Sequence, residues 1–321
     1  MRRAFALLEL LSDGAEHAGA ELAQALGVTR AAVWHQVAQL REQGLMIEAI
    51  RGHGYQMRGG FEALTAERIR TQLTDNARAT LTIETVVVTD STNERLLAAL
   101  NDGDIHGRVL LAEYQTAGRG RRGDRWVSPP GSGLCLSLAW RFDQPPATFS
   151  ALSLVVGMAI AESLRGMGVH GAMLKWPNDI LCHNGKLAGI LIEMRAEAGG
   201  PCCTVIGIGI NVQMSAASRA LISQPVEDFL HASGSYVSRN RLAAVLLSAL
   251  ARTLPQFGRD GFAPFRADWQ RYDALNGSAV KLELPNRVVV GTARGVDEHG
   301  ALIIEQGDRS ESFVSGHLSR A

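Results

Sequence analysis

The chain has 321 residues with 32 basic and 32 acidic side chains, so its formal net charge is zero at pH 7. This balance gives no overall field that would steer the protein towards polyanions or membranes, and 46% hydrophobic with 20% charged residues excludes a largely disordered chain. Four cysteines without a Cys-x-x-Cys pair argue against a disulfide scaffold and a thiolate zinc site. The length predicts two or three domains, and the absence of an 18-residue apolar run predicts that no segment spans a membrane. The sparse cysteines predict a reducing, cytoplasmic location.

The first 60 residues have the order helix, helix, tight turn, helix and hairpin. The predicted helices and strands are Arg3–Leu11, Glu21–Leu26, Arg30–Gln43, Met46–Ile50 and Tyr55–Arg58. Gly27 is expected to end the second helix, and Thr29 is expected to cap the third. This order is typical of a winged helix-turn-helix domain over residues 1–60, with Gly59-Gly60 as its linker.

The third helix and the hairpin tip carry the side chains expected to contact DNA, together with the segment 19–38. They are Arg30, His35, Gln36, Gln39 and Arg51. Residues 1–58 hold six arginines and six acids. Because neutralising phosphates supplies much of the affinity for DNA, this balance predicts binding that depends on dimerisation. The alternative is a helix-turn-helix retained only for packing or regulation.

Residues 63–272 alternate apolar strands with helices, which favours an α/β or α+β domain. The predicted strands are Thr82–Val88, Val109–Tyr114, Leu134–Trp140, Leu191–Met194 and Thr204–Ile210, and the predicted helices are Glu94–Leu100, Phe149–Gly166 and Arg241–Phe257. Residues 273–321 change to short alternating strands, which predict a small all-β barrel. These strands are Val280–Leu284, Val288–Gly295, Leu302–Gln306 and Glu311–Val314.

A glycine- and arginine-rich loop follows the second strand of the central segment. Gly118–Gly123 satisfies the dinucleotide pattern G-x-G-x-x-G, but that pattern must open a helix, and Pro129-Pro130 prevents one here. Arginines at 119, 121, 122 and 125 among three glycines instead favour a loop that closes over phosphates and carboxylates. The alternative is a solvated basic turn.

Three further patterns favour a ligand site. Only three of the 32 basic residues are lysine, and one of them, Lys186, enters a strand of core residues, where its ammonium requires an anion unless it reaches solvent. Gly207 and Gly209 in one strand indicate a close approach by a ligand or another backbone, or else a bulge. Ser91-Thr92-Asn93 stands at a strand-to-helix junction, where free backbone N–H groups converge, although capping alone explains these residue types.

Taken in order, these motifs resemble those of biotin protein ligases, and with the N-terminal helix-turn-helix they resemble the bifunctional bacterial form that is also the biotin operon repressor. The matching elements are Ser91-Thr92-Asn93, Gln115, Gly118–Gly123, Lys175-Trp176-Pro177-Asn178-Asp179, Gly185–Leu191 and Gly207–Asn211. The resemblance covers nearly the whole chain. It implies an α+β multidomain protein whose residues 63–272 form a catalytic domain related to class II aminoacyl-tRNA synthetases, and whose residues 273–321 form an SH3-like barrel.

The resemblance also implies a reaction in two steps. The carboxylate of biotin attacks the α-phosphate of Mg·ATP to give biotinyl-5′-adenylate, and a lysine of the biotin carboxyl carrier protein of acetyl-CoA carboxylase then attacks the adenylate. Operator DNA of biotin genes and a second copy of the chain, in a homodimer promoted by the adenylate, are the other implied partners.

The resemblance assigns roles to residues that match the family's motifs. Catalysis would fall to Lys186, Arg121 and Arg119. Biotin would be bound by Ser91, Thr92, Asn93, Gln115, Arg119, Gly120, Arg121, Trp126 and Lys186. ATP and Mg²⁺ would be bound by Lys175, Asn178, Asp179 and Asn211, with Asp179 as the Mg²⁺ ligand.

One loop departs from the family pattern. In repressor-type enzymes the loop after Asn211 covers the adenylate with aromatic and apolar side chains, whereas Ser215–Gln224 has no aromatic residue here. The resemblance therefore leaves the coverage of adenine, and the dimerisation that depends on it, open. Two other functions also remain: a transcription factor that senses biotin or its adenylate without turnover, and a lipoate–protein ligase.

Overall fold

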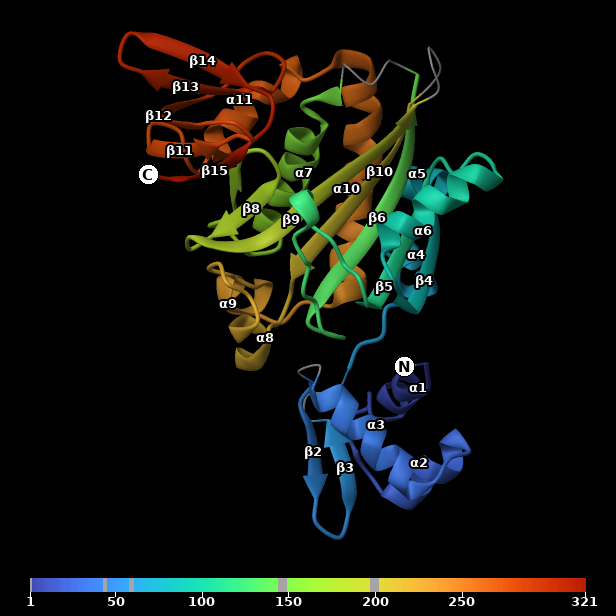
Figure 1. Ribbon diagram of the computed structural model, residues 1–321. Coiled ribbons are helices and arrows are strands. Elements are labelled where there is room, and N and C mark those ends of the chain that lie inside the picture. Colours follow the sequence, from blue (N-terminus) through green and yellow to red (C-terminus); the bar gives the residue numbers. More distant parts are fainter. Residues whose placement is uncertain (1, 43–44, 58–60, 144–148, 197–201) are drawn as a thin grey trace.

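The computed structural model of the chain describes residues 2–42, 45–57, 61–143, 149–196 and 202–321, so the predicted linker Gly59-Gly60 lies outside the described residues. Across these residues the chain forms three β-sheets, of three, seven and five strands. Figure 1 shows the small N-terminal unit extending from the large central sheet, with the C-terminal strands at the far end. The predicted α+β class is confirmed.

The N-terminal unit has the predicted winged helix-turn-helix order. Its elements are α1 (Arg2–Leu10), β1 (Glu16–His17), α2 (Gly19–Leu26), α3 (Arg30–Glu42), β2 (Ile47–Ile50) and β3 (Gly54–Met57). Gly27 ends α2 with a φ of 62°, a conformation that glycine adopts without strain, and Oγ1 of Thr29 accepts a hydrogen bond from the N–H of Ala32 at the start of α3. Buried residues of all three helices, among them Leu8, Leu22 and Val37, form one small core.

The central sheet has the strand order β4-β5-β6-β10-β9-β8-β7, and only the β4–β5 pair is parallel. Its strands are β4 (Thr82–Thr89), β5 (Arg108–Gln115), β6 (Gly133–Phe142), β7 (Met173–Lys175), β8 (Asp179–Cys182), β9 (Gly185–Ala196) and β10 (Cys202–Asn211). Its helices are α4 (Ala66–Thr71), α5 (Asp75–Thr80), α6 (Thr92–Ala99), α7 (Leu152–Gly166), α8 (Ala216–Ala220), α9 (Phe229–Ser233), α10 (Arg239–Asp260) and α11 (Ala263–Tyr272).

Alternating strand residues cover both faces of this sheet. Val109, Leu111 and Leu138 belong to the large core with α7 and α10, whereas Leu110 and Ala139 pack with α6 on the opposite face. The layered arrangement places the first turn of α6 against β5, β6 and β10, where the polar motif of that turn meets the sheet.

The C-terminal strands form an antiparallel sheet of order β14-β13-β12-β11-β15, the SH3-like unit. They are β11 (Ala279–Glu283), β12 (Val288–Val296), β13 (Leu302–Gln306), β14 (Arg309–Phe313) and β15 (His317–Arg320). The buried residues of these strands belong to the same hydrophobic core as α7, and the indole N–H of Trp176 donates to the carbonyl of Gly300 at 3.1 Å. The two sheets are therefore packed together, and β15 is a strand that periodicity did not reveal.

The N-terminal unit is joined to the central sheet by packed contacts. The N–H of Phe61 donates to the carbonyl of Ser12 at 2.9 Å, and Val88 and Tyr114 of the central sheet pack against the N-terminal core. Among the described residues, no helix is long and apolar enough to cross a membrane. The domain boundaries near residues 60–63 and 272–273 stay predictions.

Candidate functional site

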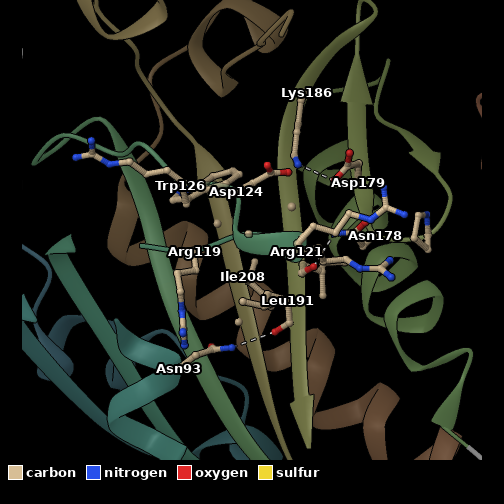
Figure 2. A pocket seen from close by; sticks show the side chains of 18 of the residues that line it. Asn93, Arg119, Arg121, Asp124, Trp126, Asn178, Asp179, Lys186, Leu191 and Ile208 are labelled. Atoms are coloured by element: carbon tan, nitrogen blue, oxygen red, sulfur yellow. Dashed lines mark hydrogen bonds and ion pairs between the residues drawn. The ribbon is translucent and has the colours of Figure 1, made fainter. Parts of the chain in front are cut away.

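A cavity opens over the middle of the central sheet. Its walls come from β9, β10, the first turn of α6, the glycine-arginine loop and the Lys175–Asp179 segment (Figure 2). The start of β15 adds a further wall. The chain brings all but one of the residues predicted to bind biotin or ATP into these walls. The predicted residues that line the cavity are Ser91, Thr92, Asn93, Gln115, Arg119, Gly120, Arg121, Trp126, Lys175, Asn178, Asp179 and Lys186.

The first turn of α6 supplies a buried polar network at one end of the cavity. Ser91 caps the helix by accepting from the N–H of Glu94, and the N–H of Thr92 donates to Oε1 of Gln115 at 2.8 Å. Ser91, Thr92 and Asn93 are each less than 5% exposed. These side chains are therefore fixed by partners, as a site that recognises a polar ring requires.

Two residues that sequence reasoning missed hold Asn93 in this network. Oγ of Ser137 donates to Oδ1 of Asn93 at 2.5 Å, and Nδ2 of Asn93 donates to Oε2 of Glu193 at 2.8 Å and to the carbonyl of Leu191 at 3.2 Å. Ser137 and Glu193 lie on β6 and β9, far from Asn93 along the chain. A lone serine within the apolar strand Leu134–Trp140 was the one available signal.

The glycines of β10 make room for two side chains of the site. A Cβ atom at Gly207 would overlap the amide of Asn93, and one at Gly209 would overlap the indole of Trp126. The indole also lies above Gly189 of β9. The close approach indicated by these glycines is thus made by side chains that line the cavity, and not by a bulge.

Lys186 stands beside Trp126 at the other end of the cavity. Its Nζ lies 5.8 Å from the centroid of the Trp126 ring and 2.8 Å from Oδ1 of Asp179. Both side chains of the ion pair are less than one-fifth exposed. Figure 2 shows the ammonium and the carboxylate pointing toward each other from neighbouring strands. An ammonium held in this way in a partly buried cavity is placed to exchange its present partner for the anion of a ligand.

The glycine-arginine loop is folded back on itself. The N–H of Gly120 donates to the carbonyl of Asp124 at 2.7 Å, and the N–H of Trp126 donates to that of Gly118 at 2.9 Å. Arg122, at the turn, has a φ of 58°. These two hydrogen bonds fold the loop back on itself and hold Trp126 at the cavity.

The arginines of this loop point in different directions. Arg119 is paired with Glu94, and its guanidinium lies 3.7 Å from Glu193, on the α6 side of the cavity. Arg121 points toward Asn178 and Asp179 (Figure 2). Burial and the charge of Arg122 lower the pKa of Arg121, and Asp179 opposes them, but a guanidinium stays protonated at neutral pH.

The β7–β8 hairpin contributes a lysine and a carboxylate that face each other in register. Burial lowers the pKa of Lys175, with the charge of Lys186 acting in the same direction and Asp179 opposing both. The side chain of Asn178 donates to the carbonyl of Ile190 at 2.8 Å and so ties the hairpin to β9. Lys175, Lys186 and Arg121 together make this part of the cavity cationic.

Asn211 is the predicted ligand-binding residue that does not line the cavity. It is 5% exposed, and Nδ2 donates to the carbonyls of Lys186 at 3.0 Å and Glu227 at 3.1 Å. The structure therefore gives it a positioning role beneath Lys186, and contact with nucleotide stays a prediction.

The residues present fit a magnesium ion. Oδ1 of Asp179 is buried, has no hydrogen bond among the described residues and faces the ammonium of Lys186. Mg²⁺ is bound through one or two carboxylates together with substrate phosphates, and this carboxylate borders a cationic cavity suited to phosphates.

Other residues that line the cavity, and that no sequence motif marked, are Asp124, Gln224 and His317.

The predicted DNA-contacting residues lie on the exposed face of α3 and in the wing. Arg30, His35, Gln39 and Arg51 are exposed, and Gln36 is half-buried. The sequence reading passed over Trp34, which is 58% exposed and whose ring packs edge-on against that of His35.

Three family profiles match the chain. The one described as the biotin/lipoate A/B protein ligase family matches residues 86–211, a helix-turn-helix domain profile matches residues 3–56, and the biotin protein ligase C-terminal domain profile matches residues 276–319.

Individual proteins are also similar to the chain over most of its length. The bifunctional ligase/repressor BirA of Escherichia coli is 38% identical over 98% of this chain and 95% of its own length. The biotin–[acetyl-CoA-carboxylase] ligase of Mycobacterium tuberculosis is 36% identical over 79% of this chain and 95% of its own. A biotin protein ligase from Aquifex aeolicus, solved with biotin and ATP, superposes with a TM-score of 0.64 at 26% identity over 75% of this chain and 99% of its own. The chain therefore belongs to the biotin protein ligase family, in the form that carries an N-terminal helix-turn-helix domain.

Proposed function

We propose that this protein activates biotin with ATP and transfers it to a lysine of a biotin carboxyl carrier protein. The observation that carries the proposal is the cavity itself. It has a fixed polar network at one end and three cations at the other end, and Trp126 lies between them. Biotin has a polar ureido ring, an apolar thiophane ring and a carboxylate tail, and these match the two ends and the middle of the cavity.

Each wall then has a role in binding. Ser91, Thr92, Asn93 and Gln115 hold the ureido ring, whose carbonyl accepts and whose N–H groups donate hydrogen bonds. Trp126 covers the apolar ring. Arg119 and Gly120 belong to the loop that closes over the tail.

The first step joins two anions. Lys186 exchanges Asp179 for the carboxylate of biotin, while Arg121 and Lys175 neutralise the α-phosphate and the departing pyrophosphate. An oxygen of the carboxylate attacks the α-phosphorus, and pyrophosphate leaves with the electron pair of the broken P–O bond. Asp179 and Asn178 would hold Mg²⁺ with the phosphates, and a bound Mg²⁺ neutralises charge on the phosphate oxygens.

The second step forms the amide. The neutral amine of the carrier lysine attacks the carbonyl carbon of the adenylate, AMP leaves, and one proton is released from the nitrogen. Lys186 stabilises the oxyanion that develops on the carbonyl oxygen. No side chain of this protein needs to be acylated.

Biotin-dependent exchange of pyrophosphate into ATP tests the activation step. We expect exchange with biotin, none with lipoate and none without an acid. Exchange that lipoate supports instead would assign the chain to lipoate ligation, and biotin binding without exchange would make it a sensor without turnover.

We also propose that the N-terminal unit represses biotin genes as an adenylate-promoted homodimer in the cytoplasm. The exposed row Arg30, Trp34 and His35 on α3, with Arg51 in the wing, supports this proposal. A gel shift on the organism's own biotin promoters should tighten when biotin and ATP are both added, because the adenylate favours the dimer that spans two half-sites. A shift that ligand leaves unchanged would contradict it.

A further inference from the structure

A second cluster of ligand-forming side chains lies outside the cavity, where the β8–β9 turn meets the start of α9. His183 belongs to the turn, and Glu227 and His231 belong to the segment that leads into and through α9. Oε2 of Glu227 lies 3.1 Å from Nδ1 of His183 and 2.9 Å from Nδ1 of His231, and Oε1 lies 2.8 Å from Nδ1 of His231. The three ligand atoms all lie within 4.8 Å of one another.

We propose that His183, Glu227 and His231 bind a divalent transition-metal cation, with Zn²⁺ as the best match. Two imidazoles and one carboxylate are a common ligand set for Zn²⁺, completed by a water. Bonds of about 2.0–2.1 Å in a tetrahedral site separate ligand atoms by about 3.3 Å. Both separations from Oε2 are close to this value, and all three ligand atoms lie within 4.8 Å of one another, so rotations of the exposed histidines would complete the site.

The carboxylate is already fixed for this task. The side chain of Glu227 is only 5% exposed, and the N–H of Asp228 donates to Oε1 of Glu227 at 2.9 Å. This hydrogen bond holds the carboxylate in place between the two imidazoles.

The surrounding charges allow a cation. Arg219 lies 3.9 Å from Oε1 of Glu227, but its guanidinium pairs with Asp228. Both histidines are more than half exposed, so solvent reaches the cluster and water can take an open ligand position. One carboxylate and one compensated arginine give the cluster a net negative charge.

A cation here would act on the loop 213–226 and on Lys186. The N–H of Glu227 donates to the carbonyl of Lys186 at 3.0 Å, and the N–H of Lys186 donates to the carbonyl of Pro225 at 2.9 Å. The cluster thus closes the base of this loop against the strand that carries Lys186. Metal binding should stiffen that base, whether or not the chain is a ligase.

Calorimetric titration of Zn²⁺ into chelator-treated full-length protein tests the site. We expect one Zn²⁺ per chain, and the His183→Ala/His231→Ala variant should bind it at least about ten-fold more weakly. His299→Ala is the matched control, because that histidine is 78% exposed beside Glu298 and should leave binding unchanged. If the double variant does not fold, the single variant His231→Ala replaces it in the titration.

Co²⁺ provides a readout of geometry that does not depend on activity. The intense visible absorption of four- or five-coordinate Co²⁺ should appear in the wild type and in His299→Ala and be lost in the double variant. Equal Zn²⁺ affinity in the wild type and the double variant, or no Zn²⁺ binding by the wild type, would overturn the proposal and leave the cluster as a hydrogen-bonded clamp.

Discussion

Nζ of Lys186 lies 2.8 Å from Oδ1 of Asp179, and the two residues come from the neighbouring strands β9 and β8. The ammonium therefore already faces an anion in a partly buried cavity. An unpaired ammonium is costly to bury, so Asp179 offsets the burial of this charge until another carboxylate replaces it.

The substitution Lys186→Ala should remove this cation and little packing. We expect biotin-dependent ATP–pyrophosphate exchange to fall by about 10²-fold or more, because a preorganised charge at the reacting carboxylate is lost. Lys281→Ala is the matched control, since Lys281 pairs with Glu283 on β11, outside the cavity. Exchange that survives in Lys186→Ala would remove the lysine from the mechanism.

Gly209→Ala should displace Trp126, because the added methyl group overlaps the indole. Overpacking of this kind costs about 1–3 kcal/mol, so the Kd for biotin should rise by about ten-fold. Gly166→Ala, at the end of α7 where nothing lies near the added carbon, should leave it unchanged.

A double-mutant cycle tests whether displacement of the Trp126 indole causes the loss of affinity for biotin. In a Trp126→Ala background, Gly209→Ala should cost little further affinity for biotin, as measured by calorimetry. Additive losses in the two variants would show that the glycine acts on something other than Trp126.

Glu113→Gln should destabilise the fold by breaking a buried ion pair. Nη1 of Arg239 lies 2.7 Å from Oε2 of Glu113, and both side chains are less than 7% exposed. Leaving a buried charge unpaired costs about 3–5 kcal/mol, whereas neutralising the exposed Asp104, which pairs with Arg141, should cost less than about 1 kcal/mol. Denaturant unfolding of Glu113→Gln and Asp104→Asn compares the two, and equal losses would contradict this account.

Asp273 should make stability depend on pH. Burial raises the pKa of Asp273 to about 6 against opposing hydrogen bonds from Leu275 and Asn276, and Oδ2 has no partner among the described residues. An acid whose pKa is raised on folding holds its proton more tightly in the folded state. Its contribution to the free energy of unfolding is therefore present below pH 4 and is lost as the pH rises to 6.

Asp273→Asn should remove this slope. The difference in the free energy of unfolding between wild type and variant should change by about 2 kcal/mol between pH 4 and pH 7, in favour of the variant at the higher pH. A difference that is constant with pH would refute the raised pKa.

The sequence predicted the elements that have strong periodicity or a distinctive motif. The strands and long helices of the central sheet followed from apolar patterns, although α10 continues to Asp260 through Pro255, and α7 begins at Leu152 instead of Phe149. The strands β7, β8 and β15 are three or four residues long, which is too short for alternation to stand out. Their pairing is decided by tertiary contacts.

The residues that contact the motif side chains within the site could not be predicted from the sequence, for a related reason. A motif marks Asn93 or Lys186 as unusual, but Ser137, Glu193 and His317 come from strands whose register brings them to the cavity only in the folded chain. Asn211 had the pattern of a ligand-binding residue, yet the fold uses both amide hydrogens on backbone carbonyls.

Transfer of biotin to a purified carrier domain by the full-length protein tests the central claim most directly. With biotin, ATP and Mg²⁺, we predict one biotin amide per carrier domain, with formation of AMP and pyrophosphate, and no transfer when ATP is omitted. A carrier domain whose acceptor lysine is replaced by arginine should stay unlabelled. If the complete mixture leaves the intact carrier unmodified, the cavity is not a ligase site and the account is wrong.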